Sequence, residues 1–238
     1  MKISVLVPFG ADDSPAGKQR AKVWRWICRR WDVLREHGQI DEVILGIDPL
    51  FGTAGLEYAL AGVVPSERAL RPFSVSRALN DAAKHAHGDV FLMFGVDHVP
   101  DPAVVSWATA QIKGHPWVRL HDTVLYATEA ATRLIVNNGP FPNFMPTDAA
   151  DWKRHSAPCP GVLAVTRAAW DAAGGMDERF AGWGYEDTEF LSRLAHTVPG
   201  GRMEPSGLPL RELYVPSTRD LNNSNMTLFS EITKERGW

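Results

Sequence analysis

The sequence predicts an α/β protein in which a mostly parallel central sheet is flanked by helices. Three short apolar runs have the length and residue types of buried strands, namely Ile3–Val7, Val43–Ile47 and Asp89–Phe94. A segment with helical features follows each run, over residues 18–37, 76–87 and 101–113. Strands that alternate with helices form parallel sheets, and ligands bind such sheets beyond the carboxyl ends of the strands.

The first half of the chain gives a reason for each of these elements. Pro8 is expected to end the first strand. Apolar side chains at helical spacing predict an amphipathic helix over 18–37, namely Trp24, Ile27, Trp31 and Leu34. Gly88 is expected to end the second helix, and Asp101-Pro102 to begin the third. Residues 49–72 contain several glycines and allow no assignment.

The second half is less regular. We expect strands over 161–166 and 211–215, a short helix ending at Ala173, a helix over 187–196 and a helix from Leu221 onward. The last helix is expected to pack Leu228, Phe229 and Ile232. The segment 137–160 holds five prolines and is expected to be a long loop, of which residues 137–158 could close over a bound ligand, the donor, as a lid.

Composition bounds the class of protein. The 238 residues are 45% hydrophobic and 22% charged, with a net charge of −3, which is typical of a globular protein and gives no global basic excess for nucleic acid. A single domain over 1–238 is expected, with halves 1–115 and 116–238. The two cysteines suggest no disulfide framework, and no run of 18 apolar residues predicts a membrane span. A cytoplasmic location is the expectation.

One motif carries most of the chemical information, the stretch GGMDERFAGWGYED over residues 174–187. Glycines allow tight turns and close approach to a ligand, and the face of Trp183 between two of them can stack on a sugar ring. Glu186 and Asp187 stand where a helix begins, and the helix dipole favours ionised carboxylates there. An ionised carboxylate beside a sugar can act as a general base on a hydroxyl.

A structural reading of the same motif stays open. Asp187 could serve only as a helix cap, and Trp183 could be a core aromatic. Capping alone does not require the flanking glycines. The complete pattern therefore favours the functional interpretation.

The stretch from Pro160 to Leu194 resembles the C-terminal motif block of GT-A glycosyltransferases of the galactosyltransferase and polypeptide N-acetylgalactosaminyltransferase type. That block combines a strand of small residues, a short helix, GGFDExFxGWGxED and a further helix. The resemblance implies a GT-A fold and the transfer of a sugar from a nucleotide-sugar. It assigns Asp187 as the base that deprotonates the acceptor and Glu186 as a partner of sugar hydroxyls. It also implies that Trp183, Gly184 and Tyr185 shape the sugar and acceptor pocket.

The N-terminal half is similar to the same superfamily in three places, Ile3–Pro8, Phe73–Asn80 and Gly88–Pro100. The last resembles the segment that carries the DxD motif, which binds Mn²⁺ or Mg²⁺ bridging the donor diphosphate. Here Gly95 replaces the first Asp, so Asp97 is the remaining metal-ligand candidate. His98 is not expected to substitute, since successive side chains of an extended segment point in opposite directions. The late metal-binding His of many relatives is also missing.

Further residues are expected to contact the nucleotide-sugar because they lie at strand ends or on the neighbouring helix face: Pro8, Phe9, Asp48, Arg77 and Asn80. Each has a structural alternative. Asp48 could be a turn residue, Arg77 a surface residue, and Asn80 a structural hydrogen-bonding residue. The basic residues of 18–35 most simply form a solvated helix face.

Together these features predict a glycosyltransferase that moves a hexose-type sugar from a nucleotide-diphosphate sugar, UDP being the expected nucleotide, to an acceptor hydroxyl with inversion. Retention stays open. The acceptor could be a glycan, a protein, a small molecule or a modified nucleobase, and a bacterial or phage source is expected. One alternative is a non-catalytic nucleotide-sugar or sugar-binding protein with a degenerate DxD motif. Another is sugar nucleotidyl transfer, for which residues 10–20 give only a poor Gly-rich loop.

Overall fold

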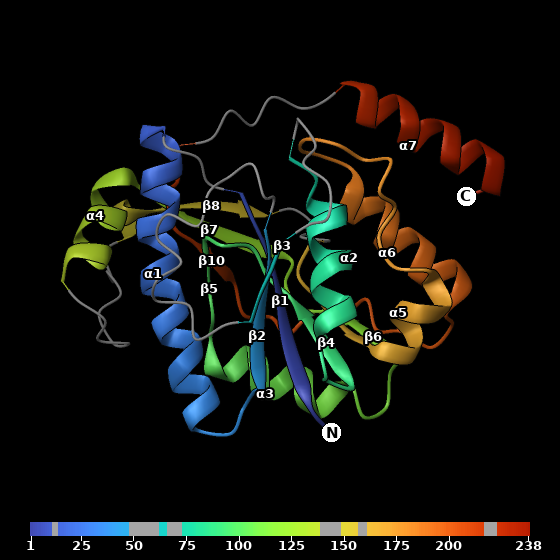
Figure 1. Cartoon of the computed structure of the whole chain (residues 1–238), viewed down its shortest axis with the longest axis horizontal. Coiled ribbons are helices and arrows are strands. Elements are labelled where there is room, and N and C mark those ends of the chain that lie inside the picture. The colour runs from blue at the N-terminus through green and yellow to red at the C-terminus, as the bar shows by residue number, and fades with distance from the viewer. Residues whose placement is uncertain (11–13, 48–61, 66–72, 139–148, 157–160, 217–222) are drawn as a thin grey trace.

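The computed structural model describes residues 1–10, 14–47, 62–65, 73–138, 149–156, 161–216 and 223–238 (Figure 1). Its strands are β1 (Ile3–Phe9), β2 (Glu42–Ile47), β3 (Gly62–Pro65), β4 (Val90–Met93), β5 (His98–Val99), β6 (Trp117–Arg119), β7 (Thr123–Ala127), β8 (Trp152–Ser156), β9 (Leu163–Thr166) and β10 (Leu210–Glu212). Its helices are α1 (Pro15–Glu36), α2 (Val75–His85), α3 (Pro102–Gln111), α4 (Glu129–Asn137), the 3-10 turn η1 (Ala149–Asp151), α5 (Arg167–Ala173), α6 (Glu186–Thr197) and α7 (Asn223–Arg236).

A six-stranded sheet forms the centre of the molecule, in the order β3-β2-β1-β4-β9-β6. The four strands from β3 to β4 are parallel, as the alternation of strands and helices predicts. β9 was also expected as a strand, but it pairs antiparallel with both β4 and β6. β3 lies within residues 49–72, where the sequence allowed no assignment.

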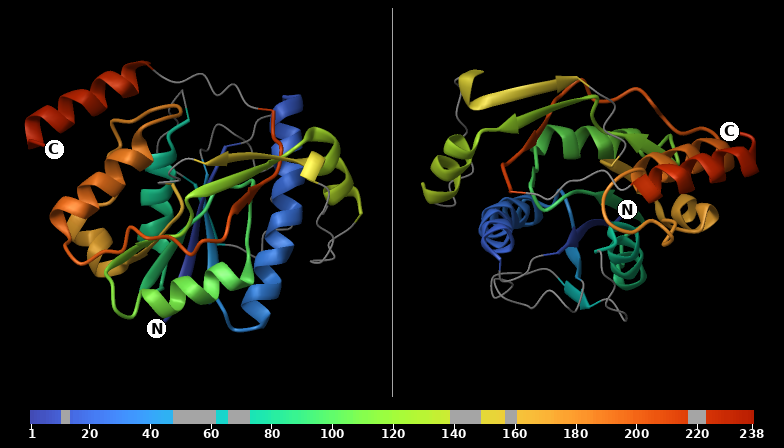
Figure 2. Two further views of the ribbon diagram at one scale, coloured as in Figure 1. Left: turned by 180° about the vertical axis from the view of Figure 1, so that it is seen from behind. Right: turned by 90° about the horizontal axis from the view of Figure 1, so that it is seen from above.

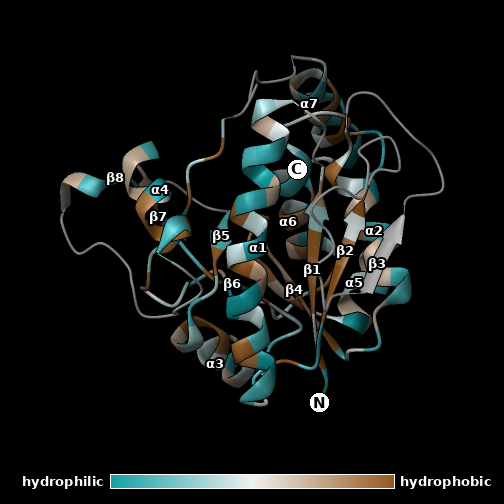
Figure 3. Ribbon diagram, turned by 60° about the vertical axis from the view of Figure 1, so that its left-hand side comes forward, coloured by the Kyte–Doolittle hydropathy of each residue, from teal (hydrophilic) through white to brown (hydrophobic). Residues whose placement is uncertain are grey.

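Alternating side chains of the strands divide the core into two layers. In β1, Val5 and Val7 pack on the side of α1 and α3, while Leu6 packs on the side of α2, α5 and α6. This alternation follows from the two-residue period of a strand. Figure 2 shows α1 and α2 on either side of the central strands, and Figure 3 shows how apolar β1 and β4 are between these layers.

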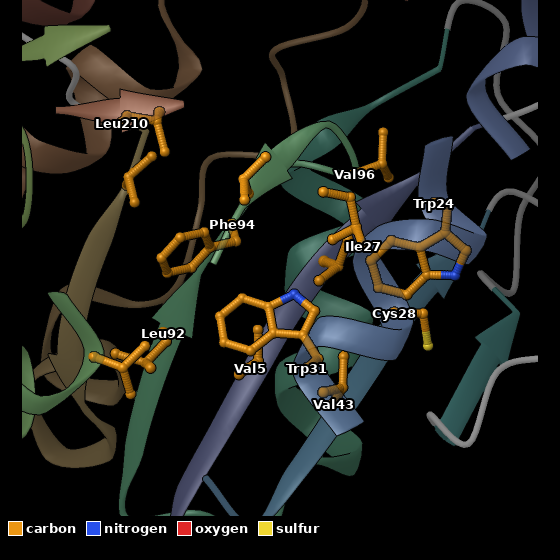
Figure 4. Packing of buried hydrophobic residues seen from close by; sticks show 14 of the residues in the cluster. Val5, Trp24, Ile27, Cys28, Trp31, Val43, Leu92, Phe94, Val96 and Leu210 are labelled. Atoms are coloured by element: carbon orange, nitrogen blue, oxygen red, sulfur yellow. The ribbon is translucent and has the colours of Figure 1, made fainter. Parts of the chain in front are cut away.

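The aromatic face of α1 is fully buried, as its periodicity predicts. Trp24, Ile27 and Trp31 are at most 1% exposed. The rings of Trp31 and Phe94 meet edge to face with their centroids 5.0 Å apart, in the part of the core drawn in Figure 4. α1 begins with Ser14, whose hydroxyl accepts from the Gly17 amide at 3.1 Å, and with Pro15 in its first turn.

The prediction that Pro8 ends the first strand was wrong. β1 continues to Phe9, and Pro8 and Phe9 pair with Gly46 and Ile47 of β2. On the other side the β4 pairing stops at Leu6, opposite Met93. Past Leu6, β4 has no carbonyl that would accept a hydrogen bond from β1. Pro8, which lacks an N–H, is therefore tolerated within the strand.

A second sheet, in the order β5-β10-β7-β8, was not predicted as a sheet. Only its strand β10 was expected, over the slightly longer range 211–215. The prediction of an uninterrupted loop over 137–160 was wrong in part, because η1 and β8 lie inside it and β8 pairs with β7 along five residues. Residues 139–148 and 157–160 lie outside the described part, so the lid hypothesis stays a prediction.

The parallel strands end on the side of the molecule where α7 lies (Figure 1). Figure 2 shows α7 beside α6 in both of its views. Among the residues that the structure describes, no helix combines the length and apolarity that a membrane crossing requires.

Candidate functional site

The motif over 174–187 forms the connection from α5 to α6, and α2 fixes its first part. The side-chain amide of Asn80 donates to the Met176 carbonyl at 2.9 Å, and its oxygen accepts from the Met176 amide at 2.8 Å. Arg77 lies one turn away on α2, and its Nε is 3.5 Å from Glu178 Oε2. Both residues therefore hold the connection in place, which matches the structural alternative for Asn80. A contact of either with a ligand stays a prediction.

The tip of the connection, residues 180–185, is called the Trp183 loop below. Its start is bound to the beginning of α2, since the Ser74 hydroxyl donates to the Phe180 carbonyl at 3.0 Å and the Gly182 amide donates to the Phe73 carbonyl at 2.9 Å. The ring of Phe73 in turn packs over Gly10, directly after β1. The Trp183 loop therefore lies at the carboxyl end of β1.

α7 fixes the other side of the Trp183 loop through Asn225, a residue for which the sequence gave no signal. Asn225 is 2% exposed. Its Nδ2 donates to the Gly184 carbonyl at 3.0 Å, and its Oδ1 accepts from the Ala181 amide at 3.4 Å. One buried amide thus joins both ends of the Gly182-Trp183-Gly184 tip. The last helix therefore satisfies two polar backbone groups of the loop, the Ala181 amide and the Gly184 carbonyl.

The backbone of the Trp183 loop is strained at one position. Tyr185 has φ 71° and ψ −13°, and it is the one residue other than glycine with positive φ in the described part of the chain. The left-handed region costs a non-glycine residue about 1–2 kcal/mol. The ring of Tyr185 stacks on Phe229 of α7 at a centroid distance of 5.5 Å, while Trp183 beside it is 42% exposed. Strain of this kind persists where surrounding contacts enforce it, often at functional sites.

Glu186 and Asp187 form the first turn of α6, as predicted. The carboxylate of Glu186 is buried and accepts from the Gly184 amide at 2.8 Å. Asp187 Oδ1 accepts from the Thr188 amide at 2.7 Å and from its hydroxyl at 3.2 Å. Asp187 is not the residue preceding the helix: that position is Tyr185, which makes no side-chain cap. Asp187 is therefore not the cap of this helix, in contrast to the structural alternative.

The environment of this pair favours the protonated forms. Burial, followed by the charge of Asp187, raises the pKa of Glu186 to about 7. Burial also raises the pKa of Asp187, against the opposing effect of the two Thr188 hydrogen bonds. A carboxylate with a raised pKa is a stronger base once ionised, and a raised pKa near a surface loop is a common property of catalytic carboxylates.

Asp187 also lies at the edge formed by the strand ends. A Cβ placed on Gly161 would stand 3.1 Å from Asp187 Oδ2. The antiparallel register of β4 and β9 places Ala164 opposite Leu92, so Gly161 lies beyond the carboxyl end of β4. Asp187 and the segment that follows β4 therefore share one edge of the sheet.

The segment after β4 brings together three side chains, two of which the sequence did not assign. Asp97 Oδ1 lies 3.9 Å from His98 Nε2, and Glu212 Oε2 lies 3.8 Å from the same nitrogen. Glu212 faces His98 because β10 pairs antiparallel with β5. All three side chains are at least five-sixths buried. No sequence signal could find Glu212, since it is 114 positions from His98 and stands in no motif.

The expectation that His98 points away from Asp97 was wrong, because the segment is not extended. Residues 95–98 form a turn in which the His98 amide donates to the Gly95 carbonyl at 3.3 Å. The imidazole folds back, and its Nδ1 accepts from the Gly95 amide at 2.8 Å. A turn removes the alternation of side chains on which the expectation rested.

The donor set of this cluster does not fit a divalent cation. His98 Nδ1 accepts a hydrogen bond from a backbone amide, so in the neutral imidazole the hydrogen is on Nε2, the nitrogen that faces the carboxylates. A metal ligand needs a lone pair there. Within the described ranges, no group of three His, Cys, Asp or Glu side chains has the geometry of a metal site.

Four further residues were expected to contact the nucleotide-sugar or to shape the pocket, and three of them lie in the described part of the chain. Phe9 is 1% exposed and packs against Trp24 with ring centroids 6.4 Å apart, which leaves only its backbone at the sheet edge. Pro8 is half-buried within β1. Asp48 lies outside the described residues, and its role stays a prediction. Gly184 uses its amide for Glu186 and its carbonyl for Asn225.

Comparisons with known proteins agree with this architecture. A family model described as the N-terminal domain of galactosyltransferase matches residues 145–206, which include the Trp183 loop and the carboxylate pair. A search of curated proteins finds no match. Many solved structures match the fold.

Two of these structures are similar over almost the whole chain. The catalytic domain of Drosophila β1,4-galactosyltransferase 7, crystallised with xylobiose, has a TM-score of 0.52 at 16% identity, over 95% of this chain and 79% of that one. Glucosyl-3-phosphoglycerate synthase of Mycobacterium tuberculosis has a TM-score of 0.54 at 16% identity, over 98% and 80%. It was also solved with Mn²⁺ and UDP-glucose. The chain therefore has the GT-A glycosyltransferase fold, as the sequence predicted.

Proposed function

We propose that this protein is a glycosyltransferase that moves a hexose-type sugar from a nucleotide-diphosphate sugar, UDP being the first nucleotide to test, to an acceptor hydroxyl. The observation that carries the proposal is the carboxylate pair at the start of α6, held beside a strained aromatic loop at the carboxyl edge of the parallel strands. The same residues fall within the galactosyltransferase match, and the structural neighbours include crystals with UDP-sugars.

Asp187 is assigned as the general base. Its carboxylate takes the proton of the acceptor hydroxyl, and the oxygen forms a bond to the anomeric carbon of the donor. The bond from that carbon to the diphosphate oxygen breaks, and its electron pair leaves with the nucleoside diphosphate. Direct displacement of this kind inverts the configuration. Glu186 is assigned to sugar hydroxyls, and exposed Trp183 to the face of a sugar ring.

The side chains around Asp97 do not form a site for the divalent cation that stabilises a leaving diphosphate in related enzymes. The proposed reaction therefore includes no step on a metal ion. A bound divalent ion would supply positive charge to that group. In this chain Asp97 contributes one carboxylate, and the adjacent His98 contributes an N–H.

A binding protein without catalytic activity is the second candidate, and Gly95 at the position of the first DxD acid favours it. The acceptor classes to test are glycans, proteins, small molecules and modified nucleobases, since all of these carry suitable hydroxyls. The two candidates differ in turnover, not in donor binding.

The test is a thermal-shift panel of nucleoside diphosphates and nucleotide-sugars on the intact protein, followed by an assay of nucleotide release. A ligand that binds only the folded state raises Tm by mass action. We expect one nucleotide series to raise Tm, and its sugar form to release nucleoside diphosphate when acceptors are added. Binding without release across acceptor classes would favour the binding protein. The absence of any shift would contradict both candidates.

A further inference from the structure

A cavity of about 430 Å³ lies beside the start of the connection from α5 to α6, within the range of about 300–1,000 Å³ that is typical of small-molecule sites. α2 lines it through Asn80 and Ala83, α5 lines it through Arg167 and Trp170, and Gly175 of the connection is also part of its lining. Both helices pack on the same face of the central sheet (Figure 1). The space beside them is therefore large enough for a small molecule.

The cavity extends away from the carboxylate pair. The Arg167 amide donates to the Asp89 carbonyl at 2.8 Å, and Arg167 Nε donates to the Gly88 carbonyl at 3.0 Å. These two carbonyls directly precede β4, so Arg167 lies at the amino end of that strand. Asp187 lies at the opposite, carboxyl edge of the sheet. The cavity is therefore a different place on the molecule from the proposed transfer site.

The indole N–H of Trp170 lacks a hydrogen-bond acceptor among the residues that the structure describes, although Trp170 is only 5% exposed. Its ring packs edge-on against Phe91 and Phe190, with centroids 5.6 Å and 5.0 Å away. The indole nitrogens of Trp24 and Trp31 are sealed in the core, whereas that of Trp170 is not. A largely buried indole N–H usually has a partner. Since Trp170 lines the cavity, a molecule in the cavity can supply that partner.

An acceptor faces the same space as this donor. A Cβ built on Gly175 would stand 3.3 Å from Trp170 Nε1 and 2.7 Å from Asn80 Oδ1, so glycine leaves open a place that both atoms reach. The amide hydrogens of Asn80 are used by the Met176 carbonyl and by Glu178, while Oδ1 accepts one bond, from the Met176 amide. One lone pair of Oδ1 is left. A hydroxyl group matches both atoms, because it accepts from the indole and donates to the amide oxygen.

The charges around the cavity cancel. Two cations and two carboxylates line it, namely Lys84, Arg167, Asp171 and Glu178. Lys84 already pairs with Asp81 at 2.9 Å, and Glu178 lies 3.5 Å from Arg77. A lining without net charge favours neither an anion nor a cation. Its volume is more than tenfold the roughly 30 Å³ of a water molecule, so the cavity has room for much more than one water.

We propose that this cavity binds one unit of a neutral saccharide, with a hydroxyl of the sugar accepting from Trp170 Nε1 and donating to Asn80 Oδ1. Neighbouring hydroxyls of the same ring can reach the charged side chains of the lining, which both donate and accept hydrogen bonds. The inference does not rest on the proposed function, because a saccharide can bind here whether or not the protein transfers a sugar.

The test follows the indole N–H of Trp170 in proton–nitrogen NMR correlation spectra of the intact protein. Its peak is assigned by its loss in Trp170→Phe. The probes are glucose, galactose and lactose, which are neutral, and inorganic phosphate as an anion. We expect a saturable shift of this peak with at least one of the sugars and none with phosphate. A peak that no sugar moves, or that phosphate moves and the sugars do not, would overturn the proposal.

Variants assign the binding to the cavity. Trp170→Phe keeps an aromatic ring against Phe91 and Phe190 and removes the N–H, so the saccharide Kd from calorimetry should rise about three- to tenfold, the contribution of one hydrogen bond. Trp107→Phe is the matched control, since it removes the indole of a half-buried residue in the other core layer and should leave the Kd unchanged. Asp171→Ala changes an exposed residue of the lining, so it should weaken binding without impairing folding.

The outcomes are independent of the proposed function. Asp187→Asn should leave the saccharide-induced shift of the Trp170 peak unchanged, and loss of the shift in this variant would mean that the sugar binds at the transfer site instead. Equal saccharide affinity of the wild type, Trp170→Phe and Asp171→Ala would also overturn the cavity as the site. The saccharide titrations contain no nucleotide, so a failure of every nucleotide and nucleotide-sugar to bind would contradict the transferase proposal alone.

Discussion

Asn225 Nδ2 lies 3.0 Å from the Gly184 carbonyl oxygen, and this bond connects the last helix to the loop that precedes the carboxylate pair. The same side chain accepts from the Ala181 amide. α7 is therefore part of the site, although α7 and the loop are separated by about forty positions in sequence.

Replacing Asn225 with Ala should lower the free energy of unfolding by about 1–3 kcal/mol for a buried partner left unsatisfied. The Trp183 loop should lose its fixed shape, so acceptor KM should rise more than kcat falls. Urea unfolding and steady-state kinetics measure the two effects. Met226→Ala is the matched control, since Met226 is the next residue of α7 and is 49% exposed. An equal effect of both changes would contradict the role of Asn225.

Tyr185→Gly should separate strain from function. Glycine relieves about 1–2 kcal/mol of left-handed strain, while loss of the stack on Phe229 removes about 0.5–1.5 kcal/mol. Stability, measured by denaturant unfolding, should therefore change by no more than about 1.5 kcal/mol, because the two effects oppose each other. Transfer should still fall, because the loop no longer presents a fixed aromatic edge. Tyr185→Phe, which keeps the backbone geometry and the ring, should retain most activity. A glycine variant with full activity would show that the strain has no role in transfer.

Asp187→Asn should reduce kcat by about 10²–10⁴-fold, the usual contribution of a general base. Donor affinity should stay within about twofold, since the amide oxygen can still accept from Thr188. Calorimetry with the nucleoside diphosphate and a transfer assay measure the two quantities separately. A parallel loss of binding and turnover would remove Asp187 from the role of base.

Glu186→Gln should make stability less dependent on pH. The pKa of Glu186 rises from 4.5 to about 7 on folding, so the folded protein keeps a proton that the unfolded chain has released. Stability is therefore greatest below about pH 4.5 for this group and falls as pH rises to about 7, with a slope of up to about 1.4 kcal/mol per pH unit. The Gln variant keeps an acceptor for Gly184 and lacks this loss.

The measurement is Tm of both proteins between pH 5 and 8. The Tm of the wild type should fall relative to that of Glu186→Gln as the pH rises from 5 towards about 7. An unchanged difference between the two proteins at all pH values would contradict a raised pKa. Glu178→Gln, an exposed acid of the same connection, is the control.

Local patterns were sufficient to predict the elements whose residues are close in sequence. The Trp24, Ile27 and Trp31 spacing predicted α1, and the Gly182-to-Asp187 motif predicted the start of α6 and its carboxylates. Expectations failed where a distant segment decides the structure. Pro8 is tolerated because β4 ends early, and β8 exists because β7 is available to pair.

The candidate site shows the same division. The carboxylate pair is encoded within one short stretch, so it could be found from the sequence. Asn225 and Glu212 reach the site through a helix contact and a strand pairing, neither of which leaves a periodic signal. His98 was misjudged because a turn, and not an extended strand, follows β4.

The pairing of β10 also has an evolutionary consequence. β10 is three residues long, and its neighbouring side chains have opposite character: Arg211 lies 3.4 Å from Asp101, and Glu212 faces His98. Since a shift of one residue exchanges the two faces of a strand, it would bring a guanidinium or an apolar side chain to the place of a carboxylate. A single insertion or deletion in the turn before β10 could thus reverse the charge of the sheet edge without altering a residue of the glycine-rich motif. Strand register is therefore a second route, besides point substitution, by which the charge of this edge can change.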